Sequence, residues 1–199
     1  MINLGKSRPI NIEGNSRLGM DICNNCTFLK ELAIIASENA DFNPICCISG
    51  LTKPLNLQRL KLHMAACVFK KNTMNLLAST FDQIPNLQEI ELMLSSSGLT
   101  DECLEIISKG LSKLRKLNGL KLDLSYNKNL SDKGVKTLAD SLKFLICLKK
   151  IIFFLDHIVL ISDEGVGQLI TELSQINALY ELELKLGSAE GITRKSSNT

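Results

Sequence analysis

Paired cysteines are the residues of this sequence whose spacing most resembles a chemical site. Cys23 and Cys26 are separated by two residues, and Cys46 and Cys47 are the next cysteines along the chain. Two thiolates at the first spacing commonly form half of a tetrahedral zinc site. Adjacent cysteines such as Cys46 and Cys47 lack the spacing that a tetrahedral site prefers. The positions of these cysteines in the surrounding sequence pattern distinguish between zinc ligands and buried thiols.

Cys67 and His63 raise a second kind of chemistry, a thiolate nucleophile with its base. This chemistry needs an imidazole within hydrogen-bonding reach of the thiol. The sequence contains no glycine-rich phosphate loop, no G-x-S-x-G and no H-E-x-x-H. A Cys/His-dependent enzyme is therefore the catalytic alternative, and it depends on this pair alone.

A repeated leucine pattern must position all of these residues. The pattern is clearest in Leu117-Asn-Gly-Leu120-Lys-Leu122, where an anchor leucine precedes alternating apolar residues. Such alternation, with a period of two, is typical of a strand. The anchors recur every 28 to 31 residues, which is too regular for chance. They are Leu29, Leu57, Leu87, Leu117, Leu148 and Leu179.

A helical pattern follows each strand pattern. Leu104, Ile107 and Leu111 have the i, i+3, i+7 spacing of an apolar helix face. An acid usually precedes this pattern, where it suits a helix N-terminus. The acids are Asp41, Asp101, Asp132 and Asp163, and Lys71 is the exception. One strand, turn and helix can bury their apolar faces only by stacking on neighbours, which predicts a solenoid with a parallel sheet inside and helices outside.

The cysteines occupy positions in this repeat that favour buried thiols. Cys23 and Cys26 fall where a later repeat has Leu111 and Leu114. Cys67 lies ten residues after its anchor, where small polar residues can bond to backbone groups at the end of a strand. Other copies have Asn39, Ser97 and Asn127 there, and the fifth copy departs with Ile158. We therefore expect no metal site, no cofactor and no catalytic pair.

The repeat resembles the leucine-rich repeat, in the long subclass of ribonuclease inhibitor and of NOD-like receptor C-terminal domains. The best match runs from Leu117 to Leu142 and includes Asp123-Leu124-Ser125-Tyr126-Asn127. The resemblance implies an α/β leucine-rich repeat solenoid, with a curved parallel sheet on the concave side and one helix per repeat on the convex side. Residues 1–28 are expected to form a partial N-terminal repeat, residues 29–186 six strands of repeats, and residues 187–199 a polar C-terminal tail.

The composition limits the classes of binding partner and the cellular compartment that we expect for this protein. Of 199 residues, 23 are basic and 21 acidic, and aromatic residues make up 5%, so nucleic acid is not an expected partner. The most apolar stretch, residues 144–161, is interrupted by charges and falls short of the roughly 20 apolar residues of a membrane span. Seven cysteines without an export signal predict reduced thiols and a cytoplasmic location.

Function is expected on the concave face, where side chains alternate with the buried leucines. Two rows, four and six residues after the anchors, supply the candidate partner-binding residues. These are Lys61, His63, Glu91, Met93, Lys121, Asp123, Ile152, Phe154, Glu183 and Lys185. The charged members can neutralise one another across neighbouring strands. Ile152 and Phe154 are large and apolar where an open strand face should be polar, which indicates a contact surface.

The sequence thus predicts a non-catalytic protein–protein interaction module, used for ligand sensing, scaffolding or inhibition. The resemblance implies a larger cytosolic receptor-like protein, of which this chain is a fragment or isoform. A structural or assembly segment of a larger solenoid, with no dedicated ligand, is the alternative. Neither end has the polar cap of a terminal repeat, so a homotypic or intramolecular contact through the exposed repeat ends is also open.

Overall fold

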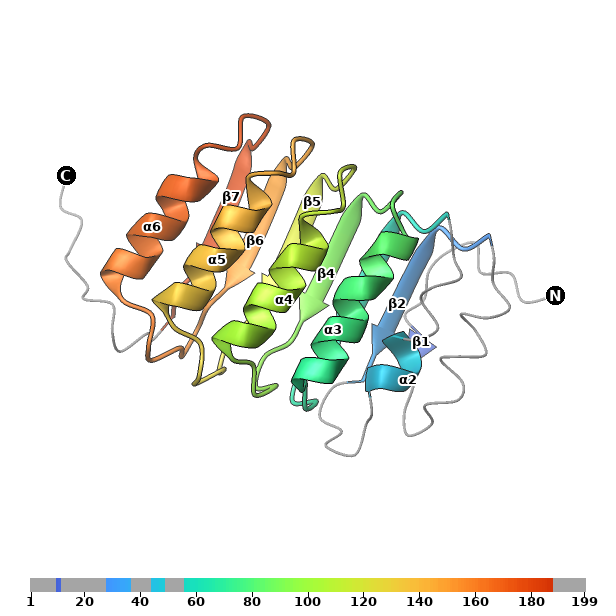
Figure 1. Ribbon diagram of the computed structural model, residues 1–199, viewed down its shortest axis with the longest axis horizontal. Coiled ribbons are helices and arrows are strands. Elements are labelled where there is room, and N and C mark those ends of the chain that lie inside the picture. The colour runs from blue at the N-terminus through green and yellow to red at the C-terminus, as the bar shows by residue number, and fades with distance from the viewer. Residues whose placement is uncertain (1–9, 12–27, 37–43, 49–55, 188–199) are drawn as a thin grey trace.

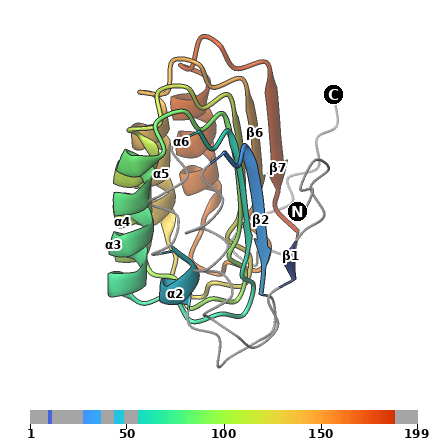
Figure 2. The ribbon, with the colours of Figure 1, turned by 90° about the vertical axis from the view of Figure 1, so that its right-hand side faces the viewer.

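The computed structural model describes residues 10–11, 28–36, 44–48 and 56–187. They form two layers, a seven-stranded parallel sheet and a row of helices on one of its faces (Figures 1 and 2). The strands are β1 (Ile10–Asn11), β2 (Glu31–Ile35), β3 (Arg59–His63), β4 (Glu89–Met93), β5 (Gly119–Asp123), β6 (Lys150–Phe154) and β7 (Glu181–Lys185). The helices are α2 (Pro44–Ile48), α3 (Lys71–Thr80), α4 (Asp101–Leu111), α5 (Asp132–Leu142) and α6 (Asp163–Leu173), and the short 3₁₀ helix η2 (Phe81–Gln83) follows α3.

The strands stack in chain order and in the register of the repeat. Leu60 pairs with Ile90, Ile90 with Leu120, and Leu120 with Ile151. Each of these side chains is at most 2% exposed, because it lies between the sheet and the helices. The column of the sheet and the apolar stripes of the helices are buried against each other, and this burial is the main source of stability of such a stack. The predicted α/β solenoid, with its apolar core between sheet and helices, is confirmed.

The sheet extends beyond the six predicted strands at its N-terminal end. β1 lies within residues 1–28, where a partial repeat is predicted, and Ile10 pairs with Ile34. At the other end, Leu182 continues the column in register but is 38% exposed. β7 is the last strand of the sheet, and none of the described residues covers its outer side.

The helix starts follow the acids, with one exception. Asp101, Asp132 and Asp163 are the first residues of α4, α5 and α6. Where the acid is absent, α3 begins at Lys71 without a capping hydrogen bond from the side chain of Lys70. Asp41 lies outside the described residues.

Polar side chains join neighbouring repeats at the ends of the strands. Asn127 is fully buried; its Nδ2 donates to Leu94 O at 3.0 Å and to Leu124 O at 2.8 Å. Its Oδ1 accepts from Ser97 N at 3.1 Å and from Leu99 N at 2.9 Å. The predicted inward turn of this side chain is therefore confirmed, and Ile158 fills the same place in the next repeat as a buried apolar residue.

The residue before this polar position has a left-handed backbone in four successive repeats. Its φ is positive at Ala66, Ser96, Tyr126 and His157. The rings of Tyr126 and His157 stack, with centroids 4.5 Å apart, on the edge of the solenoid where the strands end. His157 is exposed, as expected for the loop after a strand. No helix among the described residues has the length and apolar character needed to cross a membrane.

Candidate functional site

The face of the sheet opposite the helices, called the concave face below, carries all ten predicted site residues. Strand pairing aligns Lys61, Glu91, Lys121, Ile152 and Glu183 in one row. The second row consists of His63, Met93, Asp123, Phe154 and Lys185. The alternation of the strands places both rows on this face, because the intervening leucines fill the core.

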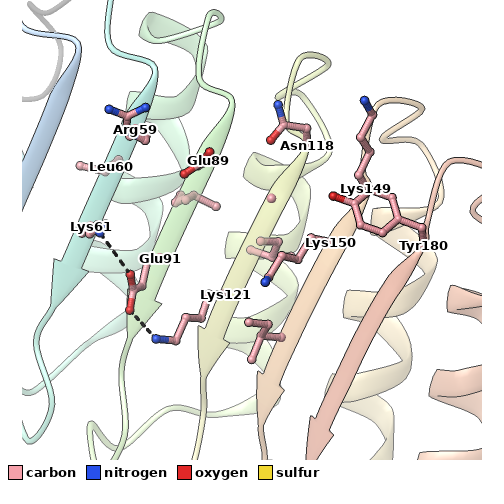
Figure 3. Close-up of a pocket in the computed structure, with 14 residues that line it drawn as sticks. Arg59, Leu60, Lys61, Glu89, Glu91, Asn118, Lys121, Lys149, Lys150 and Tyr180 are labelled. Carbon is pink, nitrogen blue, oxygen red and sulfur yellow. Dashed lines mark hydrogen bonds and ion pairs between the residues drawn. The ribbon is translucent and has the colours of Figure 1, made fainter.

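Glu91 is the centre of the charged part of this face. Its carboxylate lies 2.7 Å from Lys121 Nζ, 4.0 Å from Lys61 Nζ and 3.2 Å from His63 Nε2. The approach of His63 lacks the alignment of a hydrogen bond. Figure 3 shows Glu91 between Lys61 and Lys121. The predicted charge ladder across neighbouring strands is therefore present.

The environment of Glu91 favours its charged form. Burial raises the pKa of Glu91, but the hydrogen bond and charge of Lys121, together with the charges of His63 and Lys61, outweigh burial. Together they hold the pKa below the ordinary value of 4.5. The carboxylate thus stays ionised and fixes three basic side chains in place.

The apolar part of the concave face is less open than the sequence predicts. Ile152 and Phe154 are only half-exposed. For Phe154 the reason is that two lysines lie over its ring: Lys185 Nζ lies 4.6 Å and Lys121 Nζ 5.6 Å from its centroid. Such cation–π contacts leave an apolar surface that a partner can reach when Lys185, the more exposed of the two lysines, moves aside.

A hollow of about 510 Å³ lies on the concave face between β3 and β6. Its floor is Gly119, which stands where the neighbouring strands have Glu89 and Lys150 and has no side chain to fill the space. Asn118, Lys149 and Tyr180 surround its end where the strands begin (Figure 3). Tyr180 is 75% exposed.

Most of the cations around the hollow have carboxylate partners. Arg59 pairs with Glu31 at 2.7 Å, and Lys150 pairs with Glu181 at 2.6 Å. Arg59, Gly119 and Lys150 belong to a third row, two residues after each anchor, which the two predicted rows do not include. The alternation along each strand also predicts this third row, because it lies two residues before the first predicted row. Gly119 is the one residue of the third row without a side chain.

The residues of the catalytic alternative lie on different sides of the sheet. Cys67 is buried in the core, and its Sγ donates to Ala36 O at 2.9 Å. His63 is on the concave face beside Glu91. The structure therefore does not bring this pair together. Of the paired cysteines, Cys23 and Cys26 lie outside the described residues, as do the side chains of Cys46 and Cys47.

Comparison with known proteins agrees with the fold. No family model and no curated protein matches the sequence. The tropomodulin C-terminal domain of Caenorhabditis elegans aligns with 81% of this chain and 93% of its own, at 14% identity and a TM-score of 0.59. A leucine-rich repeat protein of Leptospira interrogans aligns with 91% of this chain and 60% of its own, at 13% identity and a TM-score of 0.29, too low to support an argument. The protein therefore has the α/β solenoid fold of leucine-rich repeats.

Proposed function

We propose that this protein is a non-catalytic recognition module that binds another protein across its concave face. The observation that carries the proposal is the hollow above Gly119, bordered by Tyr180 and next to the half-exposed Ile152. Aromatic and aliphatic anchors in a depression, with charges around them, are typical of the energetic centre of a protein interface. The hollow is open and continues along the sheet, which suits a protein segment better than an enclosed small molecule.

A protein partner also fits the charge of this face better than nucleic acid. Phosphate binding needs cations that are free to neutralise phosphates. Here Lys61 and Lys121 share Glu91, and Lys150 pairs with Glu181. Paired charges of this kind favour specificity for a partner of complementary pattern over general attraction to a polyanion.

We place the module in a larger cytosolic receptor-like protein of the ribonuclease-inhibitor-like subclass. The thiols support the cytosolic location: in the part of the chain that the structure describes, Cys103 is free and buried, and Cys147 is free and exposed. Free thiols are typical of a reducing compartment. The full helices α4, α5 and α6, each of eleven residues, support the long-repeat subclass.

The test is partner capture from cytosolic extract with the intact chain and matched variants. Gly119→Leu fills the hollow, and the site tolerates a Cβ, which would lie 3.4 Å from the Glu89 side chain. Phe154→Asp removes the apolar ring of the second row. The convex control is Lys136→Glu, an exposed position on α5.

We expect both concave variants to lose at least about tenfold of the partner that the parent chain captures, while Lys136→Glu keeps it. Thermal unfolding of each variant establishes that it is folded. Capture that survives both concave substitutions but fails with Lys136→Glu would move the binding surface to the helices and refute the proposal.

A further inference from the structure

The last strand of the sheet, β7, presents an open edge. On the side toward β6, Glu181 N donates to Lys149 O at 3.2 Å and Lys185 O accepts from Leu155 N at 2.8 Å. Backbone groups alternate in direction along a strand, so those of Leu182, Leu184 and Leu186 point away from β6. None of the described residues pairs with that side, where β7 ends the sheet (Figure 1). An edge of this kind is a template for another strand.

The apolar interior is also open at this end. Leu182 is 38% exposed, whereas Ile151 beside it is fully buried. On α6, Ile170 is 44% exposed. None of the described residues therefore gives the core of the last repeat the cover that every inner repeat receives from its successor.

Ile170 occupies a position that is small in the inner helices. The equivalent residues are Ala78, Ser108 and Ala139, and the last two are fully buried. Small residues are needed there because successive helices pack closely: a Cβ on Gly110 of α4 would stand 2.8 Å from Ala78 Cα. Isoleucine at this position is too large for another helix in the same packing. The face of α6 thus suits a different neighbour from a further repeat of the same kind.

We infer that β7 pairs antiparallel with β7 of a second copy of this chain, around a two-fold axis through Leu184. In this register Leu184 faces itself, Leu182 faces Leu186 of the second copy, and Glu183 faces Lys185 of the second copy. All leucines then lie on the core side and all facing charges are opposite, so the strand Glu181–Lys185 is complementary to itself. The same axis brings the two α6 helices side by side and covers both copies of Ile170.

The neighbouring register is less favourable. An axis through Glu183 would place this carboxylate opposite itself, and facing like charges destabilise a strand pair. The axis through Leu184 also uses the outward backbone groups of Leu182, Leu184 and Leu186 in hydrogen-bonded pairs. Charge and backbone direction therefore select one register.

The test is the mass of the intact chain by sedimentation equilibrium over a wide concentration range, with charge reversals in β7. Each Glu183–Lys185 contact occurs twice across the axis, so Glu183→Lys or Lys185→Glu turns two attractive pairs into two repulsive ones. We expect each single reversal to raise the dimer dissociation constant about tenfold or more. The combined Glu183→Lys/Lys185→Glu variant restores the opposite charges, and we expect it to dimerise like the parent.

A second pair of variants tests the helix layer of this interface. Ile170→Asp changes the helix layer, and we expect it to weaken the dimer at least tenfold. Ile146→Asp is its control, because Ile146 is 75% exposed and lies before β6, outside both β7 and α6. A chain that is monomeric at all concentrations overturns the inference, as does a dimer that tolerates the single reversals or that the double reversal does not restore. Dimerisation only after truncation behind Gly187 would make residues 188–199 the occupant and overturns it as well.

Discussion

Gly134, in the first turn of α5, lies directly against the carboxylate of Asp101, the first residue of α4. A Cβ on Gly134 would overlap this carboxylate and stand 3.3 Å from Asp101 Cα. The contact exists because Asp101 reaches into the next repeat, where it accepts from Ser131 N at 2.9 Å and from Ser131 Oγ at 2.6 Å. Asp132 makes the same pair of hydrogen bonds to Ser162, and Gly165 lies against it. Each acid thus ties its helix start to the next one.

The first prediction concerns this glycine. Gly134→Ala improves helix propensity by about 1 kcal/mol, but it forces the Asp101 carboxylate away from Ser131. We expect a net loss of about 1–2 kcal/mol in the free energy of unfolding, measured by urea denaturation. Gly167→Ala is the control, since no heavy atom lies within 4 Å of its Cβ position. There we expect a gain of about 0.5–1 kcal/mol, and equal effects at the two sites would contradict the close contact.

The second prediction tests the acid itself. Asp132→Ala leaves Ser162 N and Ser162 Oγ without their acceptor at a half-buried helix start. We expect a loss of about 2 kcal/mol, because each donor gives up a charge-assisted hydrogen bond. Asp140→Ala removes an exposed carboxylate that pairs with Lys143 at 3.3 Å, and we expect a change within about 0.5 kcal/mol. The explanation fails if both substitutions cost the same in denaturant melts.

The repeat fixed by the leucine spacing allowed the architecture and the register to be predicted. An aliphatic residue at a fixed interval can be buried only if the copies align, so Leu60, Ile90, Leu120 and Ile151 had to share one column. The acids at the helix starts were also predictable from their place in the repeat. Their role as hydrogen-bond acceptors for the following repeat was not predictable, because the sequence does not give the distance between the starts of two consecutive helices.

The candidate site was predictable in composition and less so in shape. Alternation placed Lys61, Glu91 and Lys121 on one face, and their charges indicated a ladder. The hollow depends on what is missing at Gly119, and a gap is visible only when the row on either side is known. The partial burial of Phe154 depends on the side-chain conformations of Lys121 and Lys185, and the spacing of residues in the repeat does not predict these conformations.

The third prediction concerns Asn127, whose buried side-chain amide lies in the loop after β5. Asn127→Ala removes the acceptor of Ser97 N and Leu99 N and the donor to Leu94 O. We expect a loss of about 3–4 kcal/mol, since several buried backbone groups lose their partners together.

The control for this loss is close by in the same loop. Asn129 is exposed, and we expect Asn129→Ala to change the free energy of unfolding by no more than about 0.5 kcal/mol. Ile158 shows that an apolar residue can fill the equivalent place one repeat later, so Asn127→Ile is informative too. The prediction is wrong if Asn127→Ala costs no more than Asn129→Ala, whereas an Asn127→Ile variant as stable as the parent would show that an apolar residue can replace the network.

The fourth prediction is a pH dependence that comes from Glu91. Its pKa in the folded chain lies below the ordinary 4.5, so the folded state binds this proton less readily than the unfolded state does. The carboxylate therefore adds stability above the unfolded pKa of about 4.3, and this contribution disappears as the pH falls through the folded pKa. Glu91→Gln should accordingly cost roughly 1 kcal/mol at neutral pH and almost nothing in strong acid.

The measurement is the difference in unfolding free energy between the parent and Glu91→Gln from pH 7 down to about pH 3. Glu89→Gln, at an exposed position two residues earlier on the same strand, is the matched control, and we expect a change within about 0.5 kcal/mol at neutral pH. A difference that grows toward acid would have the wrong sign. It would mean that burial dominates over Lys121, His63 and Lys61, and that Glu91 does not organise the charges of the concave face.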